Sequence, residues 1–428
     1  MKLKQGSLQL VFAAGLVLAL TLSAGAQPAG QSGIAPAPVD RLLTSPGDVV
    51  SGSLVAPPES VAGPAIARDP VAFSWPLPAD QALTEPTPFV AQSREYWRVT
   101  DAQGLAAGVE LPIASAGALI RLNPAADAAW SEQVAIDPSQ LVISRGGESF
   151  TQGEAMELLV SAEQMTAADA PFPAGTTAFR LSKDLGAGTI TLQAPGLTGA
   201  KGIYVVHVLE PASSVVASVS ADRVNYFHGD SLAVTLRLDG ASAESVRGEV
   251  ISPAGRTFPL SFAAGPAGHR AQLALDALEA PAEGLWQAEV WTVGRAGDLA
   301  VERAARTAFQ VTVPTARLSG AVEIGGKSGE GFRNLTAKVG VETVAAGRYE
   351  VRGVLYGTDA AGQLRPMGTA HSADWLEAGE GTLKLRFHRR VFAESDFGAP
   401  FEVRDLQLLD QGRMGLLEER QRAFVVSR

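Results

Sequence analysis

The sequence predicts an all-β protein: a β-rich N-terminal domain with one short helix, followed by two immunoglobulin-like β-sandwiches. Three observations support this prediction. The 428 residues include 45 glycines and 26 prolines, which favours turns and short strands over long helices. Runs of alternating apolar and polar residues recur at short intervals. Three stretches, beginning at Gly202, Gly284 and Gly347, each place an aromatic residue two positions after a glycine, at the start of such a run.

The first 26 residues have the pattern of a secretory signal peptide. Lys2 and Lys4 precede an apolar run at 8–22, and Ala24 and Ala26 occupy the small-residue positions of a cleavage site. We therefore expect cleavage after Ala26 and a periplasmic or extracellular protein. The alternative is an uncleaved anchor helix, but no basic stop-transfer flank follows the run. No second apolar stretch of about 18 residues occurs, so no transmembrane segment is expected after cleavage.

Composition and charge exclude several classes of partner and site. The chain has no cysteine, which rules out disulfides, thiolate metal sites and a lipid-modified N-terminal cysteine. The signal holds two lysines and no acidic residue, so its removal leaves 33 Lys and Arg against 45 Asp and Glu, a net charge of −12. Nucleic acids and anionic lipid surfaces attract clustered basic residues, and none are clustered here, so neither is an expected partner.

The segment before the first domain reads as a linker. Residues 27–68 are rich in proline, alanine, glycine and serine and lack the large apolar residues of a core. The N-terminal domain is expected at 69–212. Strand-like runs occur at 94–100, 108–113 and 118–124, and in the last of these Leu119 and Arg121 share one face of the strand while Ile120 and Leu122 share the other.

One helix is predicted inside this domain. Thr151 and Glu154 have the spacing of a capping box, in which each side chain bonds the other residue's backbone amide. An approximate apolar stripe then runs to about Thr166, formed by Met156, Leu159, Val160 and Met165.

Two immunoglobulin-like sandwiches are predicted at 213–315 and 316–428. The first has seven short strand-like runs in about 100 residues, the spacing typical of this fold. Its run at 231–238 alternates Leu232, Val234, Leu236 and Leu238 with Ala233, Thr235 and Arg237. In such sandwiches a tyrosine at a strand start often pins a corner through its hydroxyl group. Trp286 is expected to play the analogous part, whereas Tyr349 lies too early in its domain and is interpreted as a strand start only.

No motif identifies a catalytic centre. The chain lacks the G-x-S-x-G, S-x-x-K and H-E-x-x-H patterns, and its five histidines are dispersed. No cofactor or metal ligand is predicted. The turns at 359–362 and 395–400 could supply oxygens to calcium, but ordinary turns use the same residues, and no EF-hand loop is present.

Tyr96 and Trp97 are the candidate ligand-binding residues. They are neighbours in the run at 94–100, so one ring should face the core and the other should face outward. An outward ring is a possible stacking platform for a sugar or a partner protein, and core packing under a covered sheet face is the alternative.

The stretch "FVAQSREYWRVTDAQGLAAGVELPIASAGALIRLNP" at 89–124, followed by "GIYVVHVLEP" at 202–211, resembles a family of secreted gammaproteobacterial proteins called domain of unknown function 4785. The resemblance covers nearly the whole chain from about residue 70. It implies a β-rich N-terminal domain, immunoglobulin-like C-terminal domains and export, and it supplies no catalytic residue. The stretches at 347–364 and 400–410 are also similar to small sandwich modules of bacterial surface proteins, which present or brace another domain.

These observations favour an exported protein that binds a protein or glycan of the cell envelope without catalysis. One alternative is a hydrolase acting on glycan or peptide, with its site in the N-terminal domain. A second alternative is a structural spacer.

Overall fold

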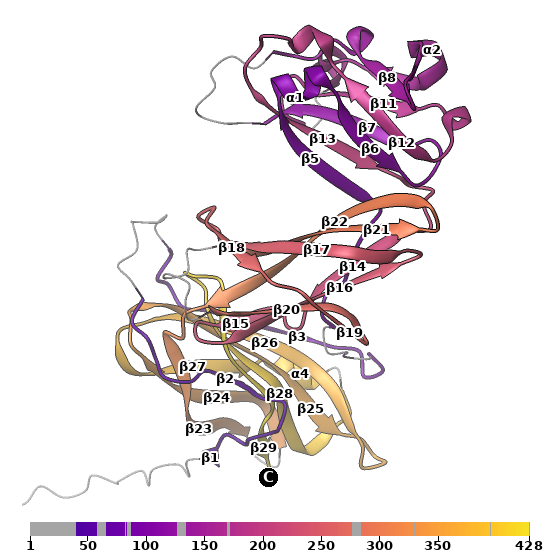
Figure 1. Ribbon diagram of the computed structural model, residues 1–428. Coiled ribbons are helices and arrows are strands. Elements are labelled where there is room, and N and C mark those ends of the chain that lie inside the picture. Colours follow the sequence, from indigo (N-terminus) through magenta and orange to yellow (C-terminus); the bar gives the residue numbers. More distant parts are fainter. Residues whose placement is uncertain are drawn as a thin grey trace, which may run out of the picture. The chain divides into compact units, whose positions relative to one another are not determined.

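The computed structural model describes residues 40–57, 66–81, 83, 87–125, 134–168, 172–275, 284–328, 331–393 and 395–427. In this part of the chain strands dominate and the helices are short, which confirms the predicted all-β class (Figure 1). The strands form six sheets, which pack in pairs around three hydrophobic cores. The predicted signal peptide lies outside the described residues.

The N-terminal domain encloses its core between two antiparallel sheets, of strand order β10-β11-β7-β13-β5 and β6-β12-β8-β9. Along β13, Tyr204, Val206 and Val208 are buried and alternate with outer residues such as His207. The outer face of the larger sheet therefore carries every second side chain. The strands are β5 (Glu95–Asp101), β6 (Val109–Ile113), β7 (Leu119–Pro124), β8 (Val142–Arg145), β9 (Glu148–Phe150), β10 (Met156–Val160), β11 (Thr177–Leu181), β12 (Gly188–Gln193) and β13 (Ile203–Leu209).

The predicted helix begins where expected but ends earlier than predicted. The Glu154 carboxylate accepts hydrogen bonds from the amide (2.9 Å) and the hydroxyl (2.7 Å) of Thr151, and the first of these is the Glu154 half of the capping box. α2 (Gln152–Ala155) then stops after one turn, because the next residues form β10 and pair with β11. The ladder with β11 supplies the backbone hydrogen bonds that a longer helix would have made.

Other short helices complete this domain. α1 (Ala102–Ala107), capped by the Asp101 side chain, was not predicted, because its six residues carry no apolar stripe. α3 (Ala162–Ala167) has its own capping box, formed by Ser161 and Gln164. Single 3₁₀ turns occur at η1 (Pro138–Gln140), η2 (Lys183–Leu185) and η3 (Pro195–Leu197).

The middle domain also has two sheets, of order β19-β20-β16-β14-β4 and β15-β22-β21-β17-β18. One strand, β4, comes from residues expected in the N-terminal domain, so the chain enters the middle domain before it forms β5. β4 has only three residues, which are too few to show an alternation of apolar and polar side chains in the sequence. The strands are β4 (Ala91–Ser93), β14 (Val216–Ala221), β15 (Asn225–Phe227), β16 (Ser231–Asp239), β17 (Ser242–Ile251), β18 (Thr257–Leu260), β19 (Ala263–Gly265), β20 (Gly268–Ala274), β21 (Trp286–Ala296) and β22 (Leu299–Thr312).

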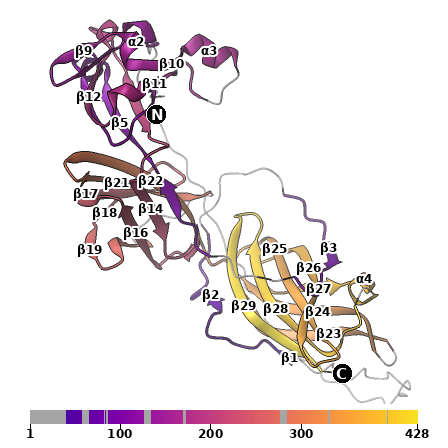
Figure 2. The same ribbon diagram turned by 90° about the vertical axis from the view of Figure 1, so that its right-hand side faces the viewer.

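The C-terminal domain packs a four-stranded sheet, β1-β23-β24-β27, on a six-stranded one, β2-β29-β28-β25-β26-β3. Three of these strands come before β5 in the sequence, and one of them, β3, falls within the residues expected in the N-terminal domain. Figure 2 shows their violet ribbons beside the orange and yellow strands. The elements are β1 (Asp40–Arg41), β2 (Val49–Val50), β3 (Val71–Pro76), β23 (Ala316–Ser328), β24 (Gly331–Thr343), β25 (Gly347–Thr358), β26 (Leu364–Leu376), β27 (Gly379–Phe387), α4 (Arg389–Ala393), β28 (Gly398–Asp410) and β29 (Gly415–Val426).

The segment interpreted as a linker at 27–68 is thus attached to the C-terminal domain within its described part. Asp48 makes the attachment: its carboxylate lies 3.1 Å from Nη1 of Arg420 and accepts hydrogen bonds from the amides of Gln421 (2.9 Å) and Ser45 (2.8 Å). Strands of two residues have no periodicity, so composition alone suggested a linker.

The aromatic residues of two of the glycine-led stretches, Tyr349 and Trp286, have different roles. The Tyr349 hydroxyl donates to the carbonyl of Ala345, four residues upstream, at 2.8 Å. This is the tyrosine-corner arrangement, so its interpretation as a strand start only is wrong. Trp286 is 1% exposed, and its Nε1 has no partner among the described residues, which makes it a core residue and not a corner pin.

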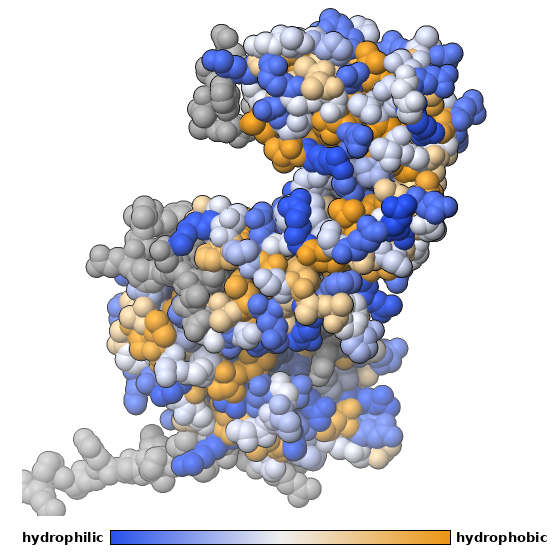
Figure 3. All heavy atoms as spheres, in the orientation of Figure 1, coloured by the Kyte–Doolittle hydropathy of each residue, from blue (hydrophilic) through white to orange (hydrophobic). Residues whose placement is uncertain are grey.

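Hydrophilic and hydrophobic residues are interspersed on the face that Figure 3 shows, so apolar residues form small patches there. None of the described helices has both the length and the apolarity needed to span a membrane.

Candidate functional site

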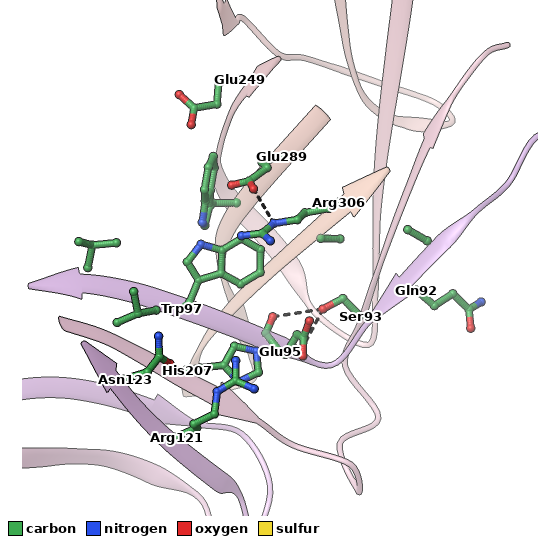
Figure 4. Close-up of a pocket in the computed structure, with 15 residues that line it drawn as sticks. Gln92, Ser93, Glu95, Trp97, Arg121, Asn123, His207, Glu249, Glu289 and Arg306 are labelled. Atoms are coloured by element: carbon green, nitrogen blue, oxygen red, sulfur yellow. Dashed lines mark hydrogen bonds and ion pairs between the residues drawn. The ribbon is translucent and has the colours of Figure 1, made fainter. Parts of the chain in front are cut away.

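A groove of about 780 Å³ lies between the larger sheet of the N-terminal domain and the β17–β21–β22 part of the middle domain (Figure 4). One wall is the outer face of β5, β7 and β13. The other is the outer face of β17, β21 and β22. A second hollow of about 460 Å³ shares Trp97, Val99, Glu249 and Trp291 with it, so the groove continues past the two indole rings.

The N-terminal wall carries a row of side chains that strand register places side by side. His207 on β13 lies opposite Arg121 on β7 and opposite Trp97 on β5. In the neighbouring row, Val205 lies between Asn123 and Val99. Since side chains directly opposite each other on one sheet face are in contact range, the wall offers a guanidinium, an imidazole, an indole and an amide together.

The middle-domain wall has a matching row. Glu289 on β21 lies opposite both Glu249 on β17 and Arg306 on β22. Arg306 Nε lies 2.5 Å from the Glu289 carboxylate, which neutralises one of the two adjacent acids. In the next row the Arg247 guanidinium covers the Trp291 ring at 4.4 Å.

The two walls touch through aromatic and cationic groups. The Arg306 guanidinium lies 4.4 Å from the centre of the Trp97 ring, and Trp97 and Trp291 meet edge to face at 5.8 Å. Arg98 and Glu302 form a further ion pair across the groove, with Nε 3.1 Å from Oε2. Cation–π and ion-pair contacts of this kind fix side-chain positions, so the groove is formed in advance of any ligand.

Two carboxylates of the groove are perturbed in opposite directions. A hydrogen bond from His207, 3.0 Å away, holds the pKa of Glu95 below its ordinary value, and the charges of His207, Arg121 and Arg306 act in the same direction. Burial raises the pKa of Glu289. The charge of Arg306 lowers this pKa, and the charge of Glu249 raises it. Glu95 therefore holds its negative charge more strongly, and Glu289 less strongly, than a free carboxyl group does.

Two buried polar atoms of the groove have no hydrogen-bond partner among the described residues, Nε of Arg121 and Oδ1 of Asn123. Burial lowers the pKa of Arg121, whose guanidinium lies 4.7 Å from the Phe172 ring. Buried polar atoms are usually hydrogen-bonded, so unpaired ones in a groove indicate where water or a ligand binds.

The structure separates the two residues singled out from the sequence. Tyr96 is 1% exposed, and its hydroxyl donates to the Pro112 carbonyl at 2.9 Å, so its ring and hydroxyl belong to the core. Trp97 points to the opposite face and lines the groove. The sequence placed Arg121 on the same strand face as Leu119 but not in a site. Glu249, Glu289, Trp291 and Arg306 had no local signal, because a second domain brings them there.

The described residues contain no group of three or more histidine, aspartate or glutamate side chains positioned to share a metal ion. In the turn considered for calcium, Asp359 Oδ1 accepts from the amides of Ala361 and Gln363, and its Oδ2 lies 3.3 Å from Arg365. These oxygens serve the turn itself.

Two family models match the chain. The N-terminal domain of the DUF4785 family, a domain of unknown function, matches residues 62–210, and the C-terminal domain of that family matches residues 315–427. No curated protein matches the chain.

Solved structures also show similarity. The crystal structure of a DUF4785 family protein from Legionella pneumophila subsp. pneumophila str. Philadelphia 1 is 21% identical, with a TM-score of 0.68 over 88% of this chain and 98% of that chain. At this identity the match shows the fold alone. A tetra-tandem repeat from the extending region of a large adhesion protein is 14% identical over 74% of this chain and 68% of that chain, with a TM-score of 0.20 that carries no argument.

Proposed function

We propose that this chain, which belongs to the DUF4785 family through its N-terminal and C-terminal domains, is an exported protein of the cell envelope that binds a glycan in the groove. The observation that carries the proposal is the pair of unpaired buried atoms in the groove that Trp97 and Trp291 line, Nε of Arg121 and Oδ1 of Asn123, with the Glu249 carboxylate in the same lining. Together they offer hydrogen-bond donors and acceptors next to aromatic surface.

This combination suits a sugar better than a purely apolar ligand. Sugar hydroxyls both donate and accept, which matches an amide, a guanidinium and a carboxylate. The CH groups of a sugar ring pack well against aromatic side chains. Binding sites typically combine an apolar or aromatic lining with a few placed polar groups, as this groove does. Export rests on the pattern of residues 1–26, and immunoglobulin-like sandwiches in the middle and C-terminal domains would present the groove.

A thermal-shift screen of the purified protein against envelope glycans tests the binding proposal. A glycan at 100 times its Kd should stabilise the protein by about 2.7 kcal/mol. The shift should disappear in Arg121→Gln and persist in the matched variant Arg237→Gln, whose side chain is 66% exposed and does not line the groove. If protein fractions shift the melting temperature and glycans do not, a protein partner is favoured. If neither glycans nor protein fractions shift it, a structural spacer is favoured.

Export has its own test. Expression of the whole chain in a Gram-negative host, followed by N-terminal sequencing of the periplasmic form, should give a protein that begins at Gln27. Retention of Met1 in the recovered protein would contradict cleavage after Ala26.

Hydrolysis is the second candidate, favoured by two carboxylates that line the same groove, Glu95 and Glu289, whose pKa values are displaced in opposite directions. In glycosidases one carboxyl group stays protonated to act as a general acid while the other stays charged. If the groove is catalytic, incubation with a bound glycan should release new reducing ends, and both Glu95→Gln and Glu289→Gln should abolish that release without loss of binding. If the glycan is still intact after prolonged incubation with the wild type, the groove binds the glycan without hydrolysing it.

A further inference from the structure

Strand β3 carries an exposed apolar row that the fold does not require. Val71, Phe73 and Trp75 alternate along this strand and are 44%, 45% and 42% exposed. β3 is also the last strand of the six-stranded sheet. Large apolar side chains on an edge strand promote aggregation, and proteins normally replace them with charged residues there. Their presence on this strand therefore needs a functional explanation.

The aromatic residues of this row form an ordered cluster with a neighbouring histidine. His371 on β26 lies opposite Phe73. The ring centres of Phe73, Trp75 and His371 are 5.2 to 5.4 Å apart, and their planes lie within 18° of parallel. We call these three residues the aromatic platform.

A chain of hydrogen bonds that starts at Glu350 on the neighbouring strand holds His371 of the platform in place. His371 Nδ1 lies 2.8 Å from Glu350 Oε1, and Glu350 Oε2 accepts a hydrogen bond from Gln411 Nε2 at 2.7 Å. The Arg348 Nε then donates to Gln411 at 2.8 Å. Because this chain of bonds sets the orientation of the imidazole, and the imidazole stacks on both other rings, little side-chain freedom remains to be lost when a ligand binds.

A polar row continues from the platform across the same sheet face. The strand register runs from His371 to Arg352, Gln407 and Glu419. Arg352 Nε donates to Gln407 at 2.5 Å, and Gln407 Nε2 donates to Glu419 at 2.9 Å. Gln407 and Glu419 also line a hollow of about 550 Å³ that includes Tyr356. Aromatic surface thus leads directly into planar groups that can bind hydroxyls.

The edge of β3 is poorly suited to an added strand. Pro70 precedes β3 and Pro76 ends it, and proline cannot donate to a sheet ladder. Any strand of a second copy or a peptide could pair only between these prolines. The face of β3 is therefore the favoured contact. The polar row carries one basic residue, Arg352, and one acidic residue, Glu419, which does not match the clustered basic residues that nucleic acids require.

We infer that the aromatic platform is a second carbohydrate-binding surface, which stacks the rings of a neutral polysaccharide and is separate from the groove. Sugar rings would lie on Phe73 and Trp75, and the row beginning at Arg352 would receive hydroxyls of the following units. The surface belongs to the C-terminal domain, so it does not depend on whether the groove binds a ligand.

Retention of the purified full chain on insoluble chitin, cellulose and starch particles tests this inference. The wild type should bind at least one of the three polysaccharides. Phe73→Ala combined with Trp75→Ala should reduce the binding constant about tenfold or more. Trp75→Phe should retain most of the binding, because the ring is kept. Phe89→Ala, which removes another exposed ring at 66% exposure, is the matched control and should have no effect.

The groove variant Arg121→Gln separates this inference from the proposed function, because it should leave retention through the platform intact. Equal retention of the double variant and the wild type would overturn the inference, as would no binding of the wild type to any of the three polysaccharides. Sedimentation that revealed a dimer in the wild type but a monomer in the double variant would assign the platform to a second copy and would also overturn it.

Discussion

Arg303 and Glu210 form a fully buried ion pair at the junction of the N-terminal and middle domains, with Nη1 2.6 Å from Oε2. Arg303 lies on β22, and Glu210 directly follows β13. The other Glu210 oxygen accepts from the amides of Ala114 (2.5 Å) and Ser115 (2.8 Å), while Arg303 Nη2 donates to the Ser213 hydroxyl at 2.7 Å. The pair links the wall that carries Trp97 to the wall that carries Arg306.

Breaking this pair should be costly, because it leaves one charge buried alone. Arg303→Met is expected to lower the free energy of unfolding by about 3 to 5 kcal/mol in urea denaturation. Lys338→Ala removes an exposed pair with Glu323, at 50% and 49% side-chain exposure, and should cost less than about 1 kcal/mol. Equal losses in the two variants would show that the buried pair does not stabilise the junction.

Stability should fall in acid through two glutamates. Hydrogen bonds from His207 and His371 hold the pKa values of Glu95 and Glu350 below their ordinary range. A lowered pKa in the folded state gives stability that is complete above the unfolded value of about 4.3 and is lost as pH falls through the folded value. The variant Glu95→Gln/Glu350→Gln should therefore be less stable than the wild type near neutral pH, and the difference should shrink below about pH 4. Urea denaturation at a series of pH values measures this, and a constant difference across the series would contradict it.

Asp48 should hold the first described strands on the C-terminal domain. Its carboxylate is 3% exposed and is shared by Arg420, Gln421 and Ser45. Asp48→Ala leaves the largely buried Arg420 with less charge compensation, so the free energy of unfolding should drop by about 2 to 4 kcal/mol. Limited proteolysis should also cut within residues 40–57 faster than in the wild type. Unchanged cleavage would mean that strand pairing alone retains the segment.

The tyrosine corner gives a narrower prediction. Tyr349→Phe removes the hydroxyl that bonds Ala345 and should cost about 1 to 2 kcal/mol of unfolding free energy. Tyr356→Phe is the control, because its hydroxyl makes no hydrogen bond with any described residue, and it should be nearly neutral. If both variants unfolded at the same urea concentration, the corner would have no energetic role.

Local patterns predicted the parts of the fold that are encoded locally. Alternation along 94–100 and 118–124 predicted that Tyr96 and Trp97 lie on opposite faces of their strand and that Arg121 lies on the face opposite Ile120 and Leu122, because strand periodicity alternates the faces. It did not predict which face is buried: in the structure Tyr96 is in the core, and Trp97 and Arg121 line the groove. The capping box of Thr151 and Glu154 marked the start of α2, because it is formed by two residues only three positions apart. Its early end could not be predicted, since pairing of β10 with β11 depends on a distant strand.

The groove depends on contacts that leave no local signal. Trp97 meets Trp291 and Arg306, which follow it by about 200 residues, through the outer faces of two separate sheets. Either residue alone resembles an ordinary outward side chain of a strand. Likewise, the two residues of β1 are too few to show a period, although their partner β23 is long.

Isothermal titration of the glycan with the largest thermal shift, against wild type and Arg121→Gln, tests the central claim most directly. The groove hypothesis predicts a saturable wild-type affinity that weakens about tenfold or more in Arg121→Gln, because loss of one charge-assisted hydrogen bond costs about 1.4 kcal/mol or more. Arg237→Gln should bind as the wild type does. Equal affinity of Arg121→Gln and wild type would contradict the claim that this groove is the binding site.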